Sequence, residues 1–254
     1  MPPKPVYITS DIHLGAVSPE REEAFRLWLL HAAERASSIV INGDLFDFWF
    51  EYREAVPRGH TRVLGILADI VDSGTPVVLM GGNHDWWGGS FLREEIGLIF
   101  HQDPLVVPLA GRDVFIAHGD GLGKGDLGYR LLRLVLRGSL TRWGFRWLHP
   151  DIGARIAQRV SRTESYGEEL TGEDRDRSAA LEAWAIQKLI DEPELDMVLL
   201  GHSHIPAVVE VGPGRYYMNA GDWIRHKSFI VLEDGAEPRL EYWGEESAGS
   251  QELP

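Results

Sequence analysis

The sequence predicts an α/β fold in which two packed sheets lie between outer helices, with a helical segment inserted between two strands. Three features predict it. Strand and helix patterns alternate over residues 6–96, whereas most later apolar runs are short and paired as hairpins. Five apolar runs end in Asp, Asn or His, the position at which open α/β sheets carry their chemistry.

The first part of the chain alternates between two kinds of apolar pattern. Short apolar runs next to turn residues predict buried strands, and apolar residues at helical spacing predict helices. In the second predicted helix, for example, Val63, Leu67 and Ile70 share one face. The predicted elements are a strand at 6–9, a helix at 20–35, a strand at 39–41, a helix at 61–71, a strand at 76–80 and a short helix at 91–96.

The second part begins with a predicted hairpin and continues through a basic helical stretch. The polar residues 161–177 are expected to form a mobile connection, and residues 244–254 are expected to be frayed. The other predicted elements are strands at 105–109 and 114–117, helices at 129–148, 152–160 and 178–190, and strands at 197–200, 207–211, 216–219, 229–232 and 240–243. We expect one domain, 1–254, with a helical insertion at 125–177.

Composition narrows the functional classes. The 254 residues include no cysteine, which excludes disulfides and thiolate metal sites. The net charge of -14 argues against general nucleic-acid binding, which needs a basic surface. The first residues lack the apolar stretch of a signal peptide, and no run approaches the ~20 apolar residues of a membrane span. A cytoplasmic protein is therefore expected.

Polar side chains follow five of the predicted strands. The stretch Gly81-Gly82-Asn83-His84-Asp85 comes directly after an apolar run, and its glycines allow a sharp turn. Alone, this stretch is equally typical of an Asn/Asp turn with a surface histidine. The same pattern recurs at the other four strand ends, which carry Asp11 and His13, Asp44, His118, and His202 and His204.

The spacing within these sets favours a metal site. Alternate residues of an extended stretch point to one side, so Asp11 with His13, and His202 with His204, could each grip one ion or two neighbouring ions. Without thiolates, such donors favour Mn, Mg, Zn or Fe. Asp47 and Asp85 are expected to support or cap these loops rather than to bind metal.

The series Asp-x-His, Gly-Asp, Gly-Asn-His-Asp, His-Gly-Asp and Gly-His-x-His resembles the calcineurin-like metallophosphoesterase superfamily, and the match runs from Asp11 to His204. This resemblance implies a four-layer α/β/β/α sandwich that binds two divalent metal ions, with Mn²⁺ expected first. It implies that Asp44 bridges the ions. The ligand sets implied are Asp11, His13, Asp44 and His204 for one metal, and Asp44, Asn83, His118 and His202 for the other.

The resemblance also implies a reaction, in which Asp44 and His84 are the catalytic residues. Two cations ~3.5–4 Å apart neutralise phosphoryl oxygens and lower the pKa of a shared water, and the resulting hydroxide attacks phosphorus. His84 would stabilise the developing charge or protonate the leaving group, and Asp85 would hold its imidazole. The alternative for His84 is a simple hydrogen bond to the backbone.

Within the superfamily, the chain resembles the lipid A pathway hydrolases that cleave UDP-2,3-diacylglucosamine. Three stretches carry this resemblance: 10–15 with 43–49, 118–129, and 219–223. It implies a nucleotide-linked glycolipid as substrate, UMP and 2,3-diacylglucosamine 1-phosphate as products, and substrate contacts at Asn83, His84, Asp126 and His202. The best-known form of that enzyme has arginine where this chain has His84, whereas histidine is usual in the wider superfamily.

The expected insertion is basic and apolar at once. Between Lys124 and Arg162 lie nine basic and only two acidic residues, interleaved with Leu, Trp and Phe. Such a segment suits an anionic lipid surface, so peripheral contact with the cytoplasmic face of the inner membrane is expected. The alternative is an ordinary packed helical pair whose arginines reach to water.

Two other functions remain open at the level of sequence. The same chemistry could serve a soluble phosphodiesterase or phosphomonoesterase acting on a cyclic nucleotide, a nucleotide or a phosphoprotein. A third class is a scaffold protein of the same fold that does no catalysis. The complete set of seven expected ligands with His84 argues against a scaffold.

Overall fold

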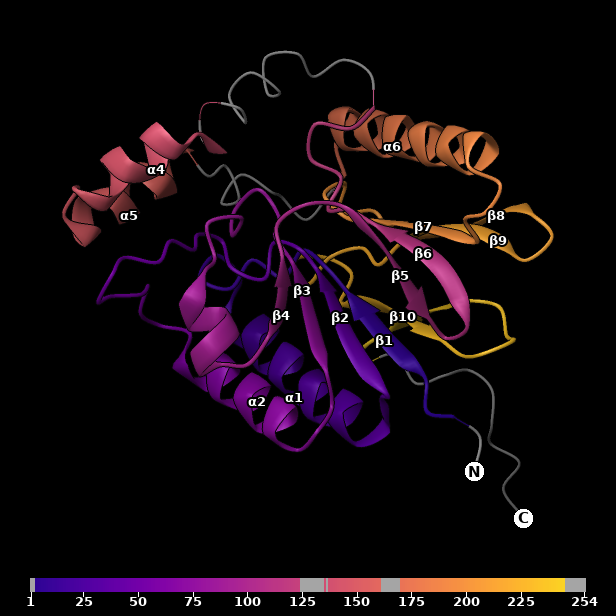
Figure 1. Cartoon of the computed structure of the whole chain (residues 1–254), viewed down its shortest axis with the longest axis horizontal. Helices are drawn as coiled ribbons and strands as arrows, with labels where there is room; N and C mark the ends of the chain where they lie inside the picture. Colours follow the sequence, from indigo (N-terminus) through magenta and orange to yellow (C-terminus); the bar gives the residue numbers. More distant parts are fainter. Residues whose placement is uncertain (1–2, 124–134, 136, 161–169, 245–254) are drawn as a thin grey trace.

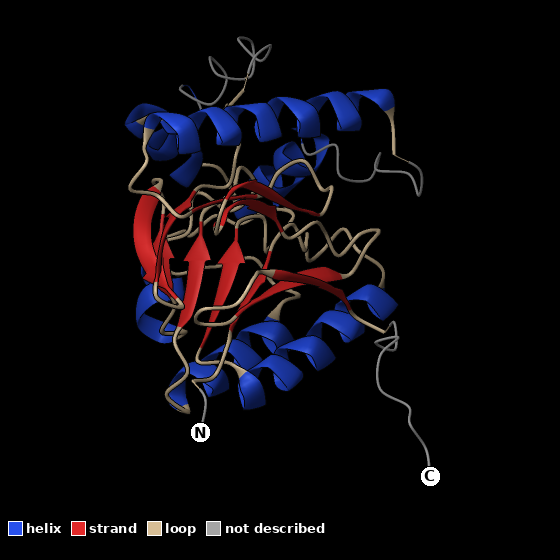
Figure 2. Ribbon diagram, turned by 90° about the vertical axis from the view of Figure 1, so that its right-hand side faces the viewer, coloured by secondary structure: helices blue, strands red, loops and turns tan. Residues whose placement is uncertain are grey.

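Two sheets pack face to face in the computed structural model, and helices cover the outer face of each sheet (Figure 1). The structure describes residues 3–123, 135, 137–160 and 170–244. Figure 2 shows the layers in side view, with one long helix above the sheets and a helical layer below them. The predicted α/β sandwich is confirmed.

The first sheet has the order β11-β10-β1-β2-β3-β4. Its strands β1 to β4 run parallel, whereas β10 is antiparallel to β1 and β11 is antiparallel to β10. The helices α1 (Pro19–Arg35) and α2 (Thr61–Asp72) make the crossovers from β1 to β2 and from β2 to β3. The strand bounds are β1 Val6–Thr9, β2 Ser38–Asn42, β3 Val77–Met80, β4 Ile99–His101, β10 Ser228–Leu232 and β11 Arg239–Tyr242.

The second sheet has the order β5-β6-β7-β9-β8. Two antiparallel hairpins, β5–β6 and β8–β9, flank the central strand β7, which is parallel to both β6 and β9. The late strands therefore combine hairpins with parallel pairs. Their bounds are β5 Leu105–Leu109, β6 Arg112–Ile116, β7 Met197–Leu200, β8 Ala207–Gly212 and β9 Arg215–Asn219.

Three apolar cores hold the layers together. The first lies under α1 and α2 and contains the fully buried Trp28 and Trp49. The second lies between the sheets and contains Ile8 and Met218. The third joins the second sheet to α6 (Gly172–Asp191), for example through Leu189. Each sheet is therefore buried on both faces, as four layers require.

Several helix predictions need correction. The region 161–177 was expected to be a connection, but α6 already begins at Gly172, because Thr171 and Asp174 form a capping box that uses the polar residues of its first turn. Residues 161–169 lie outside the described part of the chain. The segment η1 (Phe91–Glu95) is a π-helix, and β4 was not predicted because three residues are too few to display alternation.

The expected insertion contains two described helices, α4 (Ser139–Arg146) and α5 (Pro150–Val160), which project from one end of the sandwich (Figure 1). Residues 129–134 and 136 of the predicted helix 129–148 lie outside the described residues. The boundaries 125–177 remain a prediction. Within the described ranges, every helix is too short or too polar to qualify as a membrane span.

Candidate metal centre

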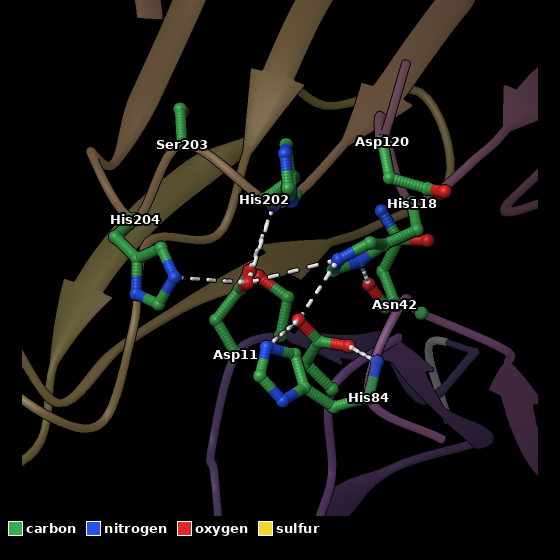
Figure 3. Close-up of polar contacts among 12 residues, drawn as sticks. Asp11, Asn42, His84, His118, Asp120, His202, Ser203 and His204 are labelled. Atoms are coloured by element: carbon green, nitrogen blue, oxygen red, sulfur yellow. Dashed lines mark hydrogen bonds and ion pairs between the residues drawn. The ribbon is translucent and has the colours of Figure 1, made fainter. Parts of the chain in front are cut away.

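The strand ends that carry polar residues meet at one edge of the sandwich. Loops after β1, β2 and β3 of the first sheet face loops after β6 and β7 of the second. Figure 3 shows Asp11 at the middle, with the rings of His118 and His204 directed toward it from the other sheet and the backbone N–H of His202 donating to it. The donor atoms form three overlapping groups, each within 4.8 Å: Asp11, His13 and His204; His13, Asp44 and His84; and Asp44, His118 and His202.

Asp44 is the carboxylate shared by two of these groups. It is buried, and its Oδ2 lies 3.1 Å from His118 Nε2, 3.7 Å from His13 Nε2 and 4.0 Å from His84 Nε2. Burial alone would raise the pKa of Asp44, but nearby His118 and His84 outweigh it and hold the pKa well below the ordinary range. Asp44 is therefore an anion facing three imidazoles.

Asp11 occupies the matching position in the first group. Its Oδ1 lies 3.6 Å from His204 Nε2 and 4.0 Å from His118 Nε2, and its carboxylate accepts the backbone N–H of His202 at 3.1 Å. The same loop brings His13, whose ring stacks on that of His204 with centroids 5.1 Å apart. The first and last of the predicted residues thus meet, although 193 positions separate them in the chain.

The histidines fall into two electrostatic classes. Burial, reinforced by neighbouring His118, holds the pKa of His202 well below the usual value, and burial likewise lowers the pKa of His13. Burial also opposes protonation of His118, but Asp44 and Asp11 outweigh it and raise its pKa well above the usual value. The buried carboxylates therefore favour the protonated form of His118, whereas burial favours the neutral form of His202 and His13, the form in which an imidazole binds metal.

The backbone at these positions is strained. Five of the seven described non-glycine residues with positive φ belong to the centre: Asp11 (53°), His13 (51°), Asp44 (51°), His202 (65°) and His204 (61°). A left-handed conformation costs an ordinary residue about 1–2 kcal/mol and gathers where a site requires it. Each loop turns sharply after its strand to aim side chains at one point, which local sequence pattern does not reveal.

Backbone carbonyls fix two of the imidazole rings. His118 Nδ1 donates to the carbonyl of Asn42 at 2.9 Å, and His84 Nδ1 donates to the carbonyl of Asp47 at 2.7 Å. Both bonds turn Nε2 toward Asp44. Nδ1 of His84 therefore makes the backbone hydrogen bond that the alternative interpretation expected, whereas Nε2 faces the centre.

Asp85 does not hold the His84 imidazole, contrary to the prediction. Its carboxylate accepts the backbone N–H of Gly82 at 2.7 Å through Oδ1 and that of Leu45 at 2.7 Å through Oδ2. It therefore ties the loop after β3 to the loop after β2. Burial and the nearby Asp44 raise the pKa of Asp85 to about 7. The expectation that Asp85 supports the loops rather than binding metal agrees with these contacts.

The residues fit divalent cations. The side-chain Oδ1 of Asn83 is buried and has no hydrogen-bond partner among the described residues, and such an oxygen suits a metal. Imidazole nitrogens and carboxylate oxygens suit Mn, Zn or Fe. The space is also closely shaped, because a Cβ at Gly82 would lie 2.1 Å from Asp44 Oδ1. Asp126 lies outside the described residues.

A model of the calcineurin-like phosphoesterase family matches residues 4–206. The chain belongs to this family. It is 31% identical over 247 residues to a UDP-2,3-diacylglucosamine hydrolase of Porphyromonas gingivalis, with 90% of this chain and 94% of that protein covered. It is 30% identical over 239 residues to a protein of the same name from Aeromonas hydrophila, with 91% and 95% covered.

Among solved structures, the chain is similar to Vps29 of Entamoeba histolytica complexed with Zn²⁺, with a TM-score of 0.43, 14% identity, and 93% of this chain and 97% of that chain covered. The assignment depends on the family model and the sequence relatives, which confirm the predicted metal-dependent phosphoesterase. This calcineurin-like phosphoesterase is therefore an enzyme with His/Asp groups able to hold divalent metal.

Proposed function

We propose that this enzyme hydrolyses the pyrophosphate bond of UDP-2,3-diacylglucosamine to UMP and 2,3-diacylglucosamine 1-phosphate, a step of lipid A synthesis. The observation that carries the proposal is the convergence of Asp11, Asp44 and five histidines at one buried point. Curated relatives named for this substrate match about nine-tenths of the chain and support the choice of substrate.

The proposed ligand sets divide the centre in two. Asp11, His13, Asp44 and His204 would hold one cation, and Asp44, Asn83, His118 and His202 would hold the other, with Mn²⁺ as the proposed metal. Two bound divalent cations supply neutralisation of the phosphoryl oxygens and a nucleophilic water at neutral pH. The strained loops and the buried carboxylates supply the fixed positions that this chemistry requires.

His84 is the proposed substrate-facing catalytic group. Its ring is half-buried, its Nδ1 is held by the carbonyl of Asp47, and its Nε2 is directed to the same side as Asp44 Oδ2. Protonated at Nε2, it would donate to a phosphoryl oxygen or to the leaving group. Asn83, which precedes His84 in the chain, is proposed to contact the substrate, as are His202 and Asp126.

An apolar surface lies beside the proposed phosphate site. Phe145 of α4 packs against Phe50 and Trp87, with ring centroids 4.7 and 5.1 Å apart, and Trp87 closely follows His84 in the chain. On α4 and at its C-terminal end, Leu140, Trp143 and Trp147 are 62–77% exposed. Diacyl substrates need such apolar cover, and exposed tryptophans suit the boundary of a lipid bilayer.

Cations border this apolar surface. The guanidinium groups of Arg137 and Arg142 lie 4.9 and 5.8 Å from the ring centroid of Trp86, and Arg137 also donates to Asp120 at 2.7 Å. Arg146 and Arg155 add positive charge on α4 and α5. This combination supports peripheral contact with an anionic membrane, such as the cytoplasmic face of the inner membrane.

The test is hydrolysis of UDP-2,3-diacylglucosamine by the Mn²⁺-loaded protein, followed as UMP release, with bis-p-nitrophenyl phosphate as a substrate that lacks acyl chains. We expect turnover of the lipid nucleotide and its loss in Asp44→Ala. Turnover of the diester without any turnover of the lipid nucleotide would favour the soluble phosphodiesterase instead. Sedimentation with anionic vesicles tests membrane contact, which Trp147→Ser with Arg146→Glu should weaken.

A further inference from the structure

We propose that Asp222 is a positioning residue that sets the tautomer of His204 and thereby controls cation affinity in the Asp11–His13–His204 half of the centre. The proposal rests on the proposed function in one respect, namely that a divalent cation binds there. Asp222 lies in the loop between β9 and β10, outside every predicted ligand set, and its side chain is fully buried.

Asp222 divides its two oxygens between the centre and its own loop. Oδ2 lies 3.2 Å from His204 Nδ1. Oδ1 accepts three N–H groups: the backbone N–H of Arg225 at 2.9 Å, the backbone N–H of His226 at 3.0 Å, and His226 Nδ1 at 3.0 Å. Because the three donors at Oδ1 fix the orientation of the carboxylate, Oδ2 is held facing His204 Nδ1.

This geometry selects one tautomer of His204. A carboxylate oxygen accepts, so Nδ1 of His204 carries the proton and donates to Asp222. In the neutral ring Nε2 is then the atom with the lone pair, and it faces Asp11 Oδ1 at 3.6 Å. A carboxylate behind a metal-binding histidine orients the ring and raises its basicity. Asp222 therefore prepares His204 to bind a cation before any cation arrives.

The described contacts between the Asp222 loop and the centre all reach the half that contains Asp11 and His204. The backbone N–H of Trp223 donates to the Asp11 carbonyl at 3.1 Å, and Ser10 Oγ donates to the Gly221 carbonyl at 2.9 Å. In the other half, His118 Nδ1 meets the neutral carbonyl of Asn42 instead of a carboxylate. Perturbing Asp222 should therefore weaken one of two cation sites and spare the other.

Asp222→Asn changes the hydrogen-bond chemistry without changing the size of the side chain. The three donors at Oδ1 would hold the amide oxygen there, which turns the amide NH₂ toward His204 Nδ1. Two donors would then face each other unless the His204 proton moves to Nε2. That move removes the lone pair from the cation site. We expect an affinity loss of about 10- to 100-fold for one cation.

The experiment uses the full chain after removal of metal with EDTA, titrated with Mn²⁺ by calorimetry. The wild type should bind two ions, and Asp222→Asn should bind one ion normally and one about 10- to 100-fold more weakly. Two-dimensional NMR of the ring nitrogens of metal-free protein provides a readout that is independent of activity. Recorded at a pH high enough for the His204 ring to be neutral, it should show the proton at Nδ1 in the wild type and at Nε2 in the variant.

Asp196→Asn is the matched control, because Asp196 also accepts a backbone N–H, from Asp113 at 2.8 Å, but lies before β7 rather than at its ligand-bearing end. It should leave both affinities unchanged. His226→Gln provides a second variant if Asp222→Asn does not fold, and it should weaken the same single cation by a smaller factor.

The outcomes separate this proposal from the proposed function. Equal weakening of both ions, no weakening, or a wild-type His204 protonated at Nε2 would overturn the role of Asp222. A wild type that binds no divalent cation would instead overturn the two-metal function, and the tautomer measurement would still decide whether Asp222 positions His204.

Discussion

Gly82→Ala offers a sharp test of how closely the centre is built. Gly82 lies in the loop after β3, and its backbone runs directly against Asp44. A Cβ added there would lie 2.1 Å from Asp44 Oδ1, 2.6 Å from Asp44 N and 2.8 Å from Asp44 Cγ. Since one of these atoms is backbone, a side-chain rotation cannot relieve the overlap, and the two loops must separate.

The size of the effect follows from these distances. Ordinary contacts of a Cβ begin at 3.4 Å, so the overlap with Oδ1 exceeds 1 Å. A misplacement of about 1 Å costs on the order of 100-fold in rate when catalysis depends on position. Overpacking a buried site typically lowers the free energy of unfolding by about 1–3 kcal/mol. The Gly82 N–H bond to Asp85 would be strained as well.

Three measurements check this prediction. Urea unfolding in EDTA gives the loss of stability, Mn²⁺ titration gives the cation affinities, and UMP release gives the rate. Gly65→Ala is the control, because Gly65 lies inside α2 with nothing within 4 Å of a Cβ, and it should stabilise the protein by about 0.5–1 kcal/mol. A Gly82→Ala protein with wild-type rate and cation affinities would refute the close contact between these loops.

Three further predictions concern His60, Asp85 and Phe145. Burial lowers the pKa of His60 to about 4, so between pH 7 and pH 5 the unfolded chain takes up a proton at this residue that the folded protein does not. The free energy of unfolding should therefore fall by about 2 kcal/mol more in the wild type than in His60→Phe over this pH range. Urea unfolding at the two pH values measures the difference. Asp85→Asn leaves one of its backbone N–H donors facing an NH₂ group and should lower the free energy of unfolding by about 1–3 kcal/mol in the same assay; an unchanged value would contradict the bridging role of this carboxylate. Phe145→Ala removes the contacts of α4 with Phe50 and Trp87, and it should raise the KM for UDP-2,3-diacylglucosamine by about 10-fold. The KM for bis-p-nitrophenyl phosphate should stay unchanged. A higher KM for both substrates would mean that these aromatic contacts support the metal centre itself.

Local pattern was sufficient for most of the fold. Buried strands such as Val77–Met80 are short apolar runs, and α2 carries an apolar face at helical spacing, so a few neighbouring residues determine each element. The errors fall where few residues carry the signal or where polar residues have a structural use. Strand β4 has three residues, and the start of α6 depends on a capping box between Thr171 and Asp174.

The sequence by itself determined the donor types and their positions at strand ends, because turn residues and alternation are local properties of the chain. Only the tertiary structure decided which donors meet. The backbone N–H of His202 donates to the carboxylate of Asp11 across 191 positions of the chain. Asp222 contacts His204 from the loop between β9 and β10. Such contacts depend on how the two sheets pack and on left-handed turns that the packing imposes, and neither is encoded in any short stretch of residues.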